Sequence, residues 1–379
     1  MKRNKIIIGS AGLVALAAFF AVSPWGFKSS EGSYSKKDLP SLESKSAEDA
    51  KQWLSARYID QATGQQITKE KLELIRSQIS KAISFVEQGP DNIGGRTRAI
   101  QVDRNNVNRL WAGGVSGGLF VSNNRANQWE RVDSYINAGA SPFISSMTQT
   151  PDGTLFVATG SNQESWAGNG VWYTTDNGAT WASIPGTTNC TELASNNVDN
   201  YVWLATNSGV RKWKLGDAAL TNVTVSSGAC STIQMSKDGQ VIVAAIGSNK
   251  TFVSSDGGST WADRSGNGSN VVASGAQRIE YSISHARVNG TYSLYAVRTG
   301  SNLLGMNVSH DDGATWSQFI GPSGTPSNLD IYRNQGTYNS IVTVVPTDNE
   351  KILIGGIDIW KWKQTVNNPP SGGFEKLTE

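Results

Sequence analysis

The chain has 379 residues, of which 33 are basic and 31 acidic, so its formal net charge is +2. This length suits one large or two ordinary domains with a buried core, and the near-zero charge excludes the strongly basic class of nucleic-acid-binding proteins. We therefore expect no nucleic-acid partner. The 40 Gly and 13 Trp indicate short strands joined by many turns.

The first 23 residues have the pattern of a secretory signal peptide, because Lys2, Arg3 and Lys5 precede an apolar run over residues 6–22. That run of about 17 residues is also at the lower limit for spanning a bilayer, and Pro24 fits poorly beside a cleavage site. An uncleaved N-terminal anchor is therefore the alternative. We expect an exported protein of the extracellular space, cell surface or periplasm, which contacts a membrane only through such an anchor.

Residues 24–86 are expected to precede the main domain as a linker and two helices. Residues 24–45 are rich in Ser, Lys and Glu, which is typical of a flexible linker. Within residues 46–86, apolar residues recur at helical spacing from Ala47 to Ile59 and from Leu72 to Ile79. We interpret these helices as packing beside the main domain, with a partner-binding module as the alternative.

From Gly94 onward the chain repeats an eight-residue turn, Ser/Thr-x-Asp-x-Gly-x-Thr-Trp, and residues 122–129 keep only the ends of this pattern. Aspartate accepts backbone N–H bonds across such a turn, glycine permits positive φ, and tryptophan fills the space between neighbouring sheets. We therefore interpret the turn residues as structural rather than catalytic or calcium-binding. The three full copies consist of Thr174, Asp176, Gly178, Thr180 and Trp181; Ser254, Asp256, Gly258, Thr260 and Trp261; and Ser309, Asp311, Gly313, Thr315 and Trp316.

Alternating strands mark six units of this repeat, including one without the turn between Trp181 and Trp261 and one after Trp316. Several short strands joined by tight turns, repeated at this period, are typical of radial blades that protect their own edges. We predict an all-β fold at residues 87–379, a β-propeller of about six visible four-stranded blades after a short α-helical segment. Either the chain is a fragment of a larger propeller, or Ser84–Glu87 closes six blades by adding an edge strand to the last blade. The expected first strands are 98–102, 144–148, 190–194, 230–235, 278–283 and 339–344.

The repeated turns resemble the Asp-box (BNR) repeats of sialidases, sortilin-type receptors and xyloglucanase-like glycoside hydrolases. The segment from Gly89 to Ile100, together with Ala112 to Gly118, resembles the exported propeller proteins of Bacteroidota, many of which carry a sorting domain for type IX secretion. The resemblance implies an exported sortilin-like or glycosyl hydrolase-like propeller. The chain departs from these enzymes because it lacks the sialidase Arg-Ile-Pro motif before the first turn and the xyloglucanase aspartate near residues 113–118.

The sequence predicts neither a metal centre nor a cofactor site. Its two histidines, His285 and His310, do not combine with Cys or acidic residues at metal-ligand spacing. Cys190 and Cys230 begin consecutive first strands, which in an exported protein favours a disulfide between them. Two buried thiols are the alternative, because adjacent strands diverge and the Cα atoms must lie within about 7 Å.

A propeller binds ligands over its central channel, and we expect the face opposite the repeated turns to do so. Sugar recognition combines aromatic rings with carboxylates, and glycosidic hydrolysis requires two carboxylates across the scissile bond. Glu164 and Asp330 are the candidate acid and base of a hydrolase, with solvated loop charges as the alternative. The expected ligand-binding residues are Trp166, Tyr332, Arg333, Arg98, Arg278 and Glu280.

Three functions remain open from the sequence. The first is a non-catalytic, exported propeller that binds glycan or protein at the cell surface. The second is a secreted, xyloglucanase-like glycoside hydrolase acting on polysaccharide. The third is a scaffold subunit that docks through the helical segment.

Overall fold

The computed structural model describes residues 96–160, 165–188, 190–247, 249–321, 329–367 and 370–378. The predicted leader, linker and helical segment of residues 1–86 and the predicted closing strand Ser84–Glu87 lie outside these residues. In the described part, regular structure is almost entirely β, with six four-stranded antiparallel sheets and two short helices. We call the sheets blades 1 to 6 in chain order.

The elements have the following bounds. Blade 1 holds β1 (Thr97–Val102), β2 (Leu110–Gly114), β3 (Leu119–Ser122) and β4 (Glu130–Arg131). Blade 2 holds β5 (Ile144–Gln149), β6 (Leu155–Thr159), β7 (Val171–Thr174) and β8 (Ala182–Ser183). Blade 3 holds β9 (Cys190–Ala194), β10 (Val202–Thr206), β11 (Gly209–Trp213) and β12 (Thr221–Val223). Blade 4 holds β13 (Cys230–Met235), β14 (Ile242–Ile246), β15 (Lys250–Ser254) and β16 (Ala262–Asp263). Blade 5 holds β17 (Arg278–Ile283), β18 (Leu294–Thr299), β19 (Leu303–Ser309) and β20 (Ser317–Ile320). Blade 6 holds β21 (Ile341–Val345), β22 (Asp348–Gly355), β23 (Ile359–Asn367) and β24 (Pro370–Lys376). Helix α4 (Asp133–Asn137) follows blade 1, and α5 (Gly336–Asn339) precedes blade 6.

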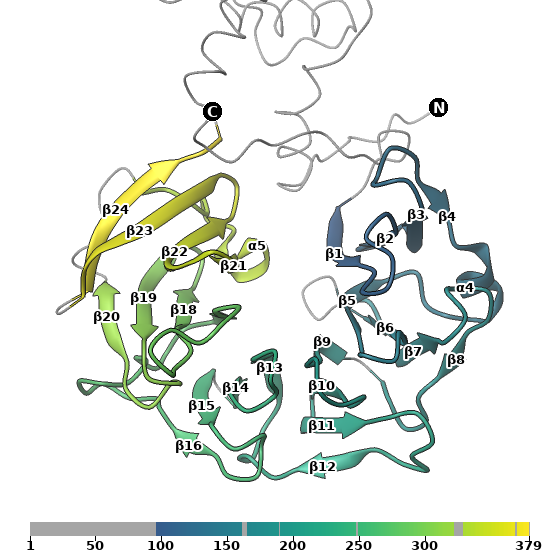
Figure 1. Cartoon of the computed structure of the whole chain (residues 1–379), viewed down its shortest axis with the longest axis horizontal. Helices are drawn as coiled ribbons and strands as arrows, with labels where there is room; N and C mark the ends of the chain where they lie inside the picture. Colours follow the sequence, from purple (N-terminus) through teal and green to yellow (C-terminus); the bar gives the residue numbers. More distant parts are fainter. Residues whose placement is uncertain are drawn as a thin grey trace, which may run out of the picture. The chain divides into compact units, whose positions relative to one another are not determined.

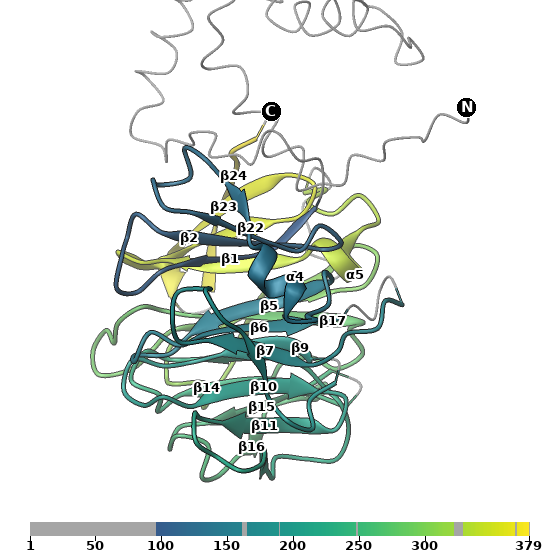
Figure 2. The ribbon, with the colours of Figure 1, turned by 90° about the vertical axis from the view of Figure 1, so that its right-hand side faces the viewer.

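The blades follow one another around a common axis, with the first strand of each blade innermost (Figure 1). The turned view shows the sheets of blades 1, 2 and 3 as successive layers (Figure 2). Inner strands of consecutive blades contact each other from β1 through β5, β9, β13 and β17 to β21. The predicted β-propeller is confirmed, and each predicted first strand matches an observed inner strand to within two residues at either end.

Burial explains why the middle strands read as apolar runs. All residues of β6, β14 and β18 are buried, because neighbouring blades cover both faces of each sheet. The outer strands β4 and β8 have two residues each, all exposed, so they present little free edge for pairing with other chains. Five apolar clusters fill the spaces between consecutive blades, so packing between blades holds the fold together.

The repeated turns satisfy their own polar groups. In the first full copy, Asp176 Oδ1 accepts from the Thr180 N–H at 2.9 Å and Oδ2 accepts from the Thr180 hydroxyl at 2.6 Å. The Thr174 hydroxyl donates to Asp176 and accepts from the Gly178 N–H. The hydroxyl and N–H of Thr180 lower the pKa of Asp176 to about 2. Gly178 has φ +87°, a conformation that glycine adopts without a steric penalty.

The degenerate copy at residues 122–129 keeps this geometry with different side chains. Asn124 Oδ1 accepts from the Gln128 N–H at 2.9 Å, and the Ser122 hydroxyl accepts from the Ala126 N–H at 2.8 Å. Ala126 occupies the glycine position with φ +65°. An amide oxygen therefore replaces the carboxylate as turn acceptor.

The predicted disulfide between Cys190 and Cys230 is wrong. Both cysteines are buried free thiols. Each thiol donates within its own strand, Cys190 Sγ to the Glu192 carbonyl at 3.3 Å and Cys230 Sγ to the Thr232 carbonyl at 3.4 Å. Burial raises the pKa of both thiols. Equivalent places in consecutive blades thus do not bring the two sulfur atoms together.

Candidate functional site

A β-bulge recurs near the start of the inner strand in blades 1 to 4. In blade 1, Thr97 pairs with Gly114 and Ala99 with Gly113, so Arg98 is the extra residue. The same shift makes Ser145, Thr191 and Ser231 the extra residues of β5, β9 and β13. Bulges re-aim side chains and are common beside functional sites.

The hydroxyls at two of these bulges join neighbouring blades. The Ser145 hydroxyl donates to the Cys190 carbonyl at 2.6 Å, and the Thr191 hydroxyl donates to the Cys230 carbonyl at 3.2 Å. The Ser231 hydroxyl instead donates to Asn249 Oδ1 at 2.7 Å. Arg98 has the equivalent place in blade 1, so a charged guanidinium stands where the repeat otherwise has a hydroxyl.

Charged side chains from blades 1, 3 and 5 interact at the end where the inner strands begin. We call Arg96, Arg98, Glu192, Arg278 and Glu280 the strand-start cluster. Arg278 Nε donates to Glu280 Oε1 at 2.5 Å, and Arg278 Nη1 donates to the Thr337 carbonyl of α5 at 3.3 Å. The Arg96 guanidinium lies 5.6 Å from the centre of the Tyr338 ring, also on α5. Helix α5 thus contributes two contacts to the cluster.

Burial sets the charge state of the cluster. It raises the pKa of Glu192 to about 8, and the nearby Glu280 adds to this rise. Glu192 Oε2 accepts from the Ile233 N–H at 2.9 Å, and Oε1 accepts from Gln234 Nε2 at 2.5 Å. Burial also lowers the pKa of Arg98 to about 10, helped by the charges of Arg96 and Arg278. The cluster therefore holds like charges close together, in an environment that disfavours them.

The structure brings together Arg98, Arg278 and Glu280, which the sequence nominated as ligand-binding residues. Glu192 was missed, although comparing the blades could have found it. Glu192 pairs with Ala205 in blade 3, as Ser146 pairs with Ala158 in blade 2. A carboxylate thus stands where blade 2 has a hydroxyl.

Of the other nominated residues on the loop before blade 6, Tyr332 interacts electrostatically with Arg278 and Glu280 of the cluster. Tyr332 is 1% exposed and its hydroxyl lies 3.1 Å from Ser340 Oγ, so it is a core residue and the expected ligand contact is wrong. Arg333 donates to Asp358 Oδ2 at 2.7 Å. Asp330 is exposed and accepts from the Arg333 N–H at 3.2 Å.

Trp166 is half-buried and stacks on Phe143, with ring centres 4.8 Å apart. Phe143 directly precedes β5 and Trp166 lies on the loop between β6 and β7, so both residues lie at the blade end where the inner strands begin. Glu164 lies outside the described residues. The predicted pairing of Glu164 and Asp330 as catalytic acid and base therefore remains a prediction.

Among the residues that the structure describes, no three His, Cys, Asp or Glu side chains gather as they would around a metal ion. In the same part of the chain, no helix has the length and apolar character needed to cross a membrane.

Comparison with known proteins gives a short sequence match and a broad fold match. No family model matches the chain. Over 82 residues, 21% of this chain, it is 35% identical to a probable oligoxyloglucan-reducing end-specific xyloglucanase of Neosartorya fischeri. The match spans only 9% of that enzyme's length.

Among solved structures, an ancestral GH74 enzyme superposes with a TM-score of 0.52 and 14% identity, over 76% of this chain and 44% of that one. An auxiliary nutrient binding protein from Bacteroides thetaiotaomicron superposes with a TM-score of 0.48 and 11% identity, over 75% of this chain and 70% of that one. At these identities the likeness to the GH74 enzyme concerns the propeller fold. This chain covers less than half of the GH74 chain.

Proposed function

We propose that this chain is an exported, non-catalytic β-propeller that binds a glycan or a protein at the cell surface through the strand-start cluster. The observation that supports this most is the place of Arg98, which stands where the next blades carry hydroxyls. The charge of Arg98 is disfavoured there, because burial and the charges of Arg96 and Arg278 lower the pKa of its guanidinium. A charge kept at such a cost suits the recognition of a ligand.

The unfavourable electrostatics of the strand-start cluster support a binding role. Desolvating charges and holding like charges together destabilises a fold, so such groupings concentrate at functional sites. Guanidinium groups donate in a planar fork to carboxylates and other oxygen ligands. Carboxylates accept from sugar hydroxyls, and the stacked rings of Phe143 and Trp166 add an aromatic surface. These groups together suit a hydroxyl-rich or charged ligand.

The hydrogen bonds of the two carboxylates favour binding over hydrolysis. Both oxygens of Glu192 accept from donors of the next blade, and Glu280 is paired with Arg278 at 2.5 Å. A catalytic acid must direct its proton at the glycosidic oxygen, and its partner carboxylate must reach the sugar carbon or a water. Neither group is directed in this way.

A glycoside hydrolase is the second candidate. It is favoured by the 35% identity over 82 residues with a protein named as a xyloglucanase, and by the pKa of Glu192, which at about 8 keeps that group protonated at neutral pH. Glu192 would then be the acid and Glu280 the second carboxylate. Glu164 with Asp330 is the other pair to test.

Release of reducing ends from xyloglucan oligosaccharides tests the hydrolase. A hydrolase would lose at least about a hundredfold in rate in Glu192→Gln and Glu280→Gln, or in Glu164→Gln and Asp330→Asn. A binding module would show no turnover in the unmodified chain. Export is tested separately, by recovering the chain from the medium, surface and periplasmic fractions of its cells.

Binding is tested by screening a glycan array and measuring the affinity of the best ligand by calorimetry. We expect Arg98→Gln to weaken binding at least about tenfold without lowering the melting temperature, since the pKa of Arg98 shows that the fold disfavours its charge. Arg131→Gln is the matched control, because Arg131 is exposed and paired with Asp133 at 2.6 Å. Unchanged binding by Arg98→Gln would overturn the proposal.

A further inference from the structure

A cavity of about 200 Å³ lies at the opposite end of the inner strands, where β13, β17 and β21 end. It is smaller than the roughly 300–1,000 Å³ of pockets for drug-sized ligands, so it suits a small molecule rather than a polysaccharide chain. Its polar lining comes from Gln234, Lys237, Ser282, Ser284, His285 and Thr343. None of these lining residues is acidic.

Two nitrogen groups meet at the mouth of this cavity. Lys237 Nζ lies 3.0 Å from His285 Nδ1, and both side chains are exposed. Burial lowers the pKa of His285, and the charge of Lys237 lowers it further. Among the described residues, neither group has a carboxylate within ion-pair distance. An ammonium beside an imidazole, both open to solvent, attracts an anion.

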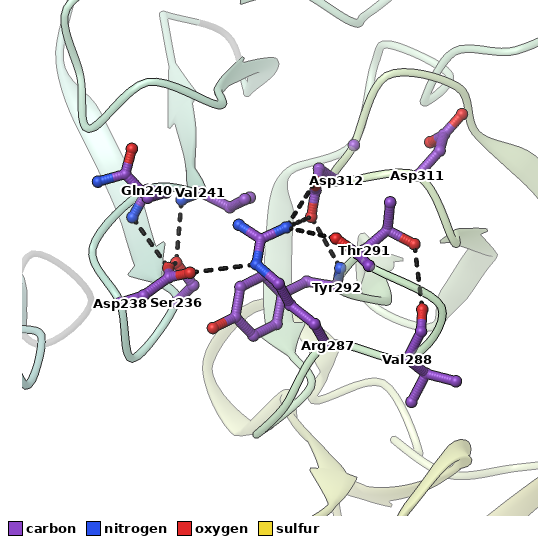
Figure 3. A network of polar contacts seen from close by, with 12 residues as sticks. Ser236, Asp238, Gln240, Val241, Arg287, Val288, Thr291, Tyr292, Asp311 and Asp312 are labelled. Atoms are coloured by element: carbon purple, nitrogen blue, oxygen red, sulfur yellow. Dashed lines mark hydrogen bonds and ion pairs between the residues drawn. The ribbon is translucent and has the colours of Figure 1, made fainter.

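The nearest carboxylates are held elsewhere by a network that joins blades 4 and 5 (Figure 3). Arg287 Nε donates to Asp238 Oδ2 at 3.2 Å, and Arg287 Nη1 donates to Asp312 Oδ2 at 2.9 Å. The guanidinium also lies 4.4 Å from the centre of the Tyr292 ring. The network fixes the two turns that carry Lys237 and His285.

The other charged groups near His285 come from these same elements. Asp238 follows Lys237 on its turn, and Arg287, which donates to Asp238, lies on the same loop as His285. Glu192 accepts a hydrogen bond from the side chain of the lining residue Gln234. Strand β21 contributes only uncharged residues. The ammonium of Lys237 is thus balanced by no acidic side chain of the cavity lining.

The hydroxyl of Ser282 adds a donor inside the cavity. Its oxygen accepts from the Val344 N–H at 3.0 Å, which leaves its proton for a ligand. The Ser284 hydroxyl, in contrast, already donates to the Ala286 carbonyl at 3.0 Å. Lys237, His285 and Ser282 therefore offer three donors to one small space.

We propose that this cavity binds a small anion, a carboxylate or a phosphate, through Lys237, His285 and Ser282. The site is separate from the strand-start cluster, and its test does not depend on the function proposed above. A carboxylated monosaccharide and free phosphate share the required chemistry and are distinguished by experiment.

The two histidines of the full chain provide the readout by NMR. His310 serves as internal reference, because its ring nitrogens lie 2.8 Å from Ser293 Oγ and 3.2 Å from Gln364 Oε1. We expect galacturonate or inorganic phosphate to shift the His285 ring signals saturably and to raise the pKa of His285, while His310 stays unchanged. Whichever probe saturates identifies the anion class, and galactose is the uncharged control.

Lys237→Gln should weaken the affinity for the saturating probe at least about tenfold. Lys250→Gln is the matched control, an exposed lysine at the start of β15 and hence at the other end of the blade. A melting curve checks that both variants fold. The proposal is overturned if neither anion gives a saturable shift, if His310 moves equally, or if the two variants bind alike.

Discussion

The turn aspartates and Glu192 are carboxylates of one fold with opposite pKa shifts. Asp176 accepts all of its described side-chain bonds from residues within four positions along the chain. Glu192 accepts from residues 41 and 42 positions away, in the next blade. The first carboxylate is exposed and strongly acidic, whereas the second is held where burial disfavours its charge. Donors in the same turn stabilise the charged form of Asp176, whereas packing of the blades buries Glu192 and destabilises its charged form.

The same contrast separates structure from function. A turn whose polar groups bond to one another can recur in several blades, and in this chain it does. A charged side chain whose partners lie in a neighbouring blade, such as Glu192, occurs only at one position. Four expected outcomes test this distinction, in order of decreasing effect.

Loss of a turn tryptophan should have the largest effect. Trp316 is 1% exposed, donates to the Gly313 carbonyl at 3.1 Å and packs in the cluster between blades 4 and 5. We expect Trp316→Ala to lower the free energy of unfolding by about 3–5 kcal/mol, measured by urea denaturation. A loss below about 1 kcal/mol would mean that this turn does not hold the blades together.

Glu192 should make stability fall as pH rises. Its folded pKa, about 8, lies above its ordinary value of 4.5, so its contribution is fully present below about pH 4.5 and is lost as pH rises towards about 8. We expect a decline of at most a few kcal/mol over this window, measured by denaturation at several pH values. Glu192→Gln should flatten the decline, and Asp330→Asn should leave it in place.

A turn aspartate should show the opposite dependence. Burial opposes the shift at Asp311, but the hydroxyl and N–H of Thr315 lower its pKa overall. Its contribution is therefore present above its ordinary pKa of 3.8 and is lost as pH falls below that value. At neutral pH we expect Asp311→Ala to cost about 1–2 kcal/mol. Asp311→Asn should cost less, since Asn124 already accepts in the degenerate copy; an equal cost would contradict this.

The smallest effect is expected from repairing the degenerate turn. Ala126 has φ +65°, where glycine is favoured, so Ala126→Gly should stabilise the chain by about 0.5–1 kcal/mol. Gly258→Ala is the reverse control, because its new Cβ would lie 2.4 Å from the ring of Trp203 at φ +84°. Thermal melting compares the two, and the comparison fails if both changes have the same sign.

The fold could be predicted because its signals are local. Strand alternation and the turn residues occur within a few positions of each other, so the inner strands were found from the sequence. The site was predicted only in part. Arg98, Arg278 and Glu280 were nominated from their strand positions. Glu192 lies in a predicted first strand, but its partners come from another blade, which the sequence of that strand does not reveal.

Loop positions were predicted least well, because their side chains depend on how the loop folds back. Tyr332 was expected on the binding face and instead lies in the core beside Ser340. Arg333, which was expected to reach a ligand, pairs with Asp358 and stays half exposed, so its ligand contact remains a prediction. Composition reveals which groups a loop carries but not which way they turn.

The two unpaired thiols have a consequence for following the motion of the molecule. Cys190 and Cys230 are the first residues of adjacent inner strands, and burial raises the pKa of both. Thiol reagents attack the thiolate, so neither cysteine should be alkylated while blades 3 and 4 stay packed. The rate of their alkylation therefore measures how often that pair of blades parts, without any label being introduced into the chain.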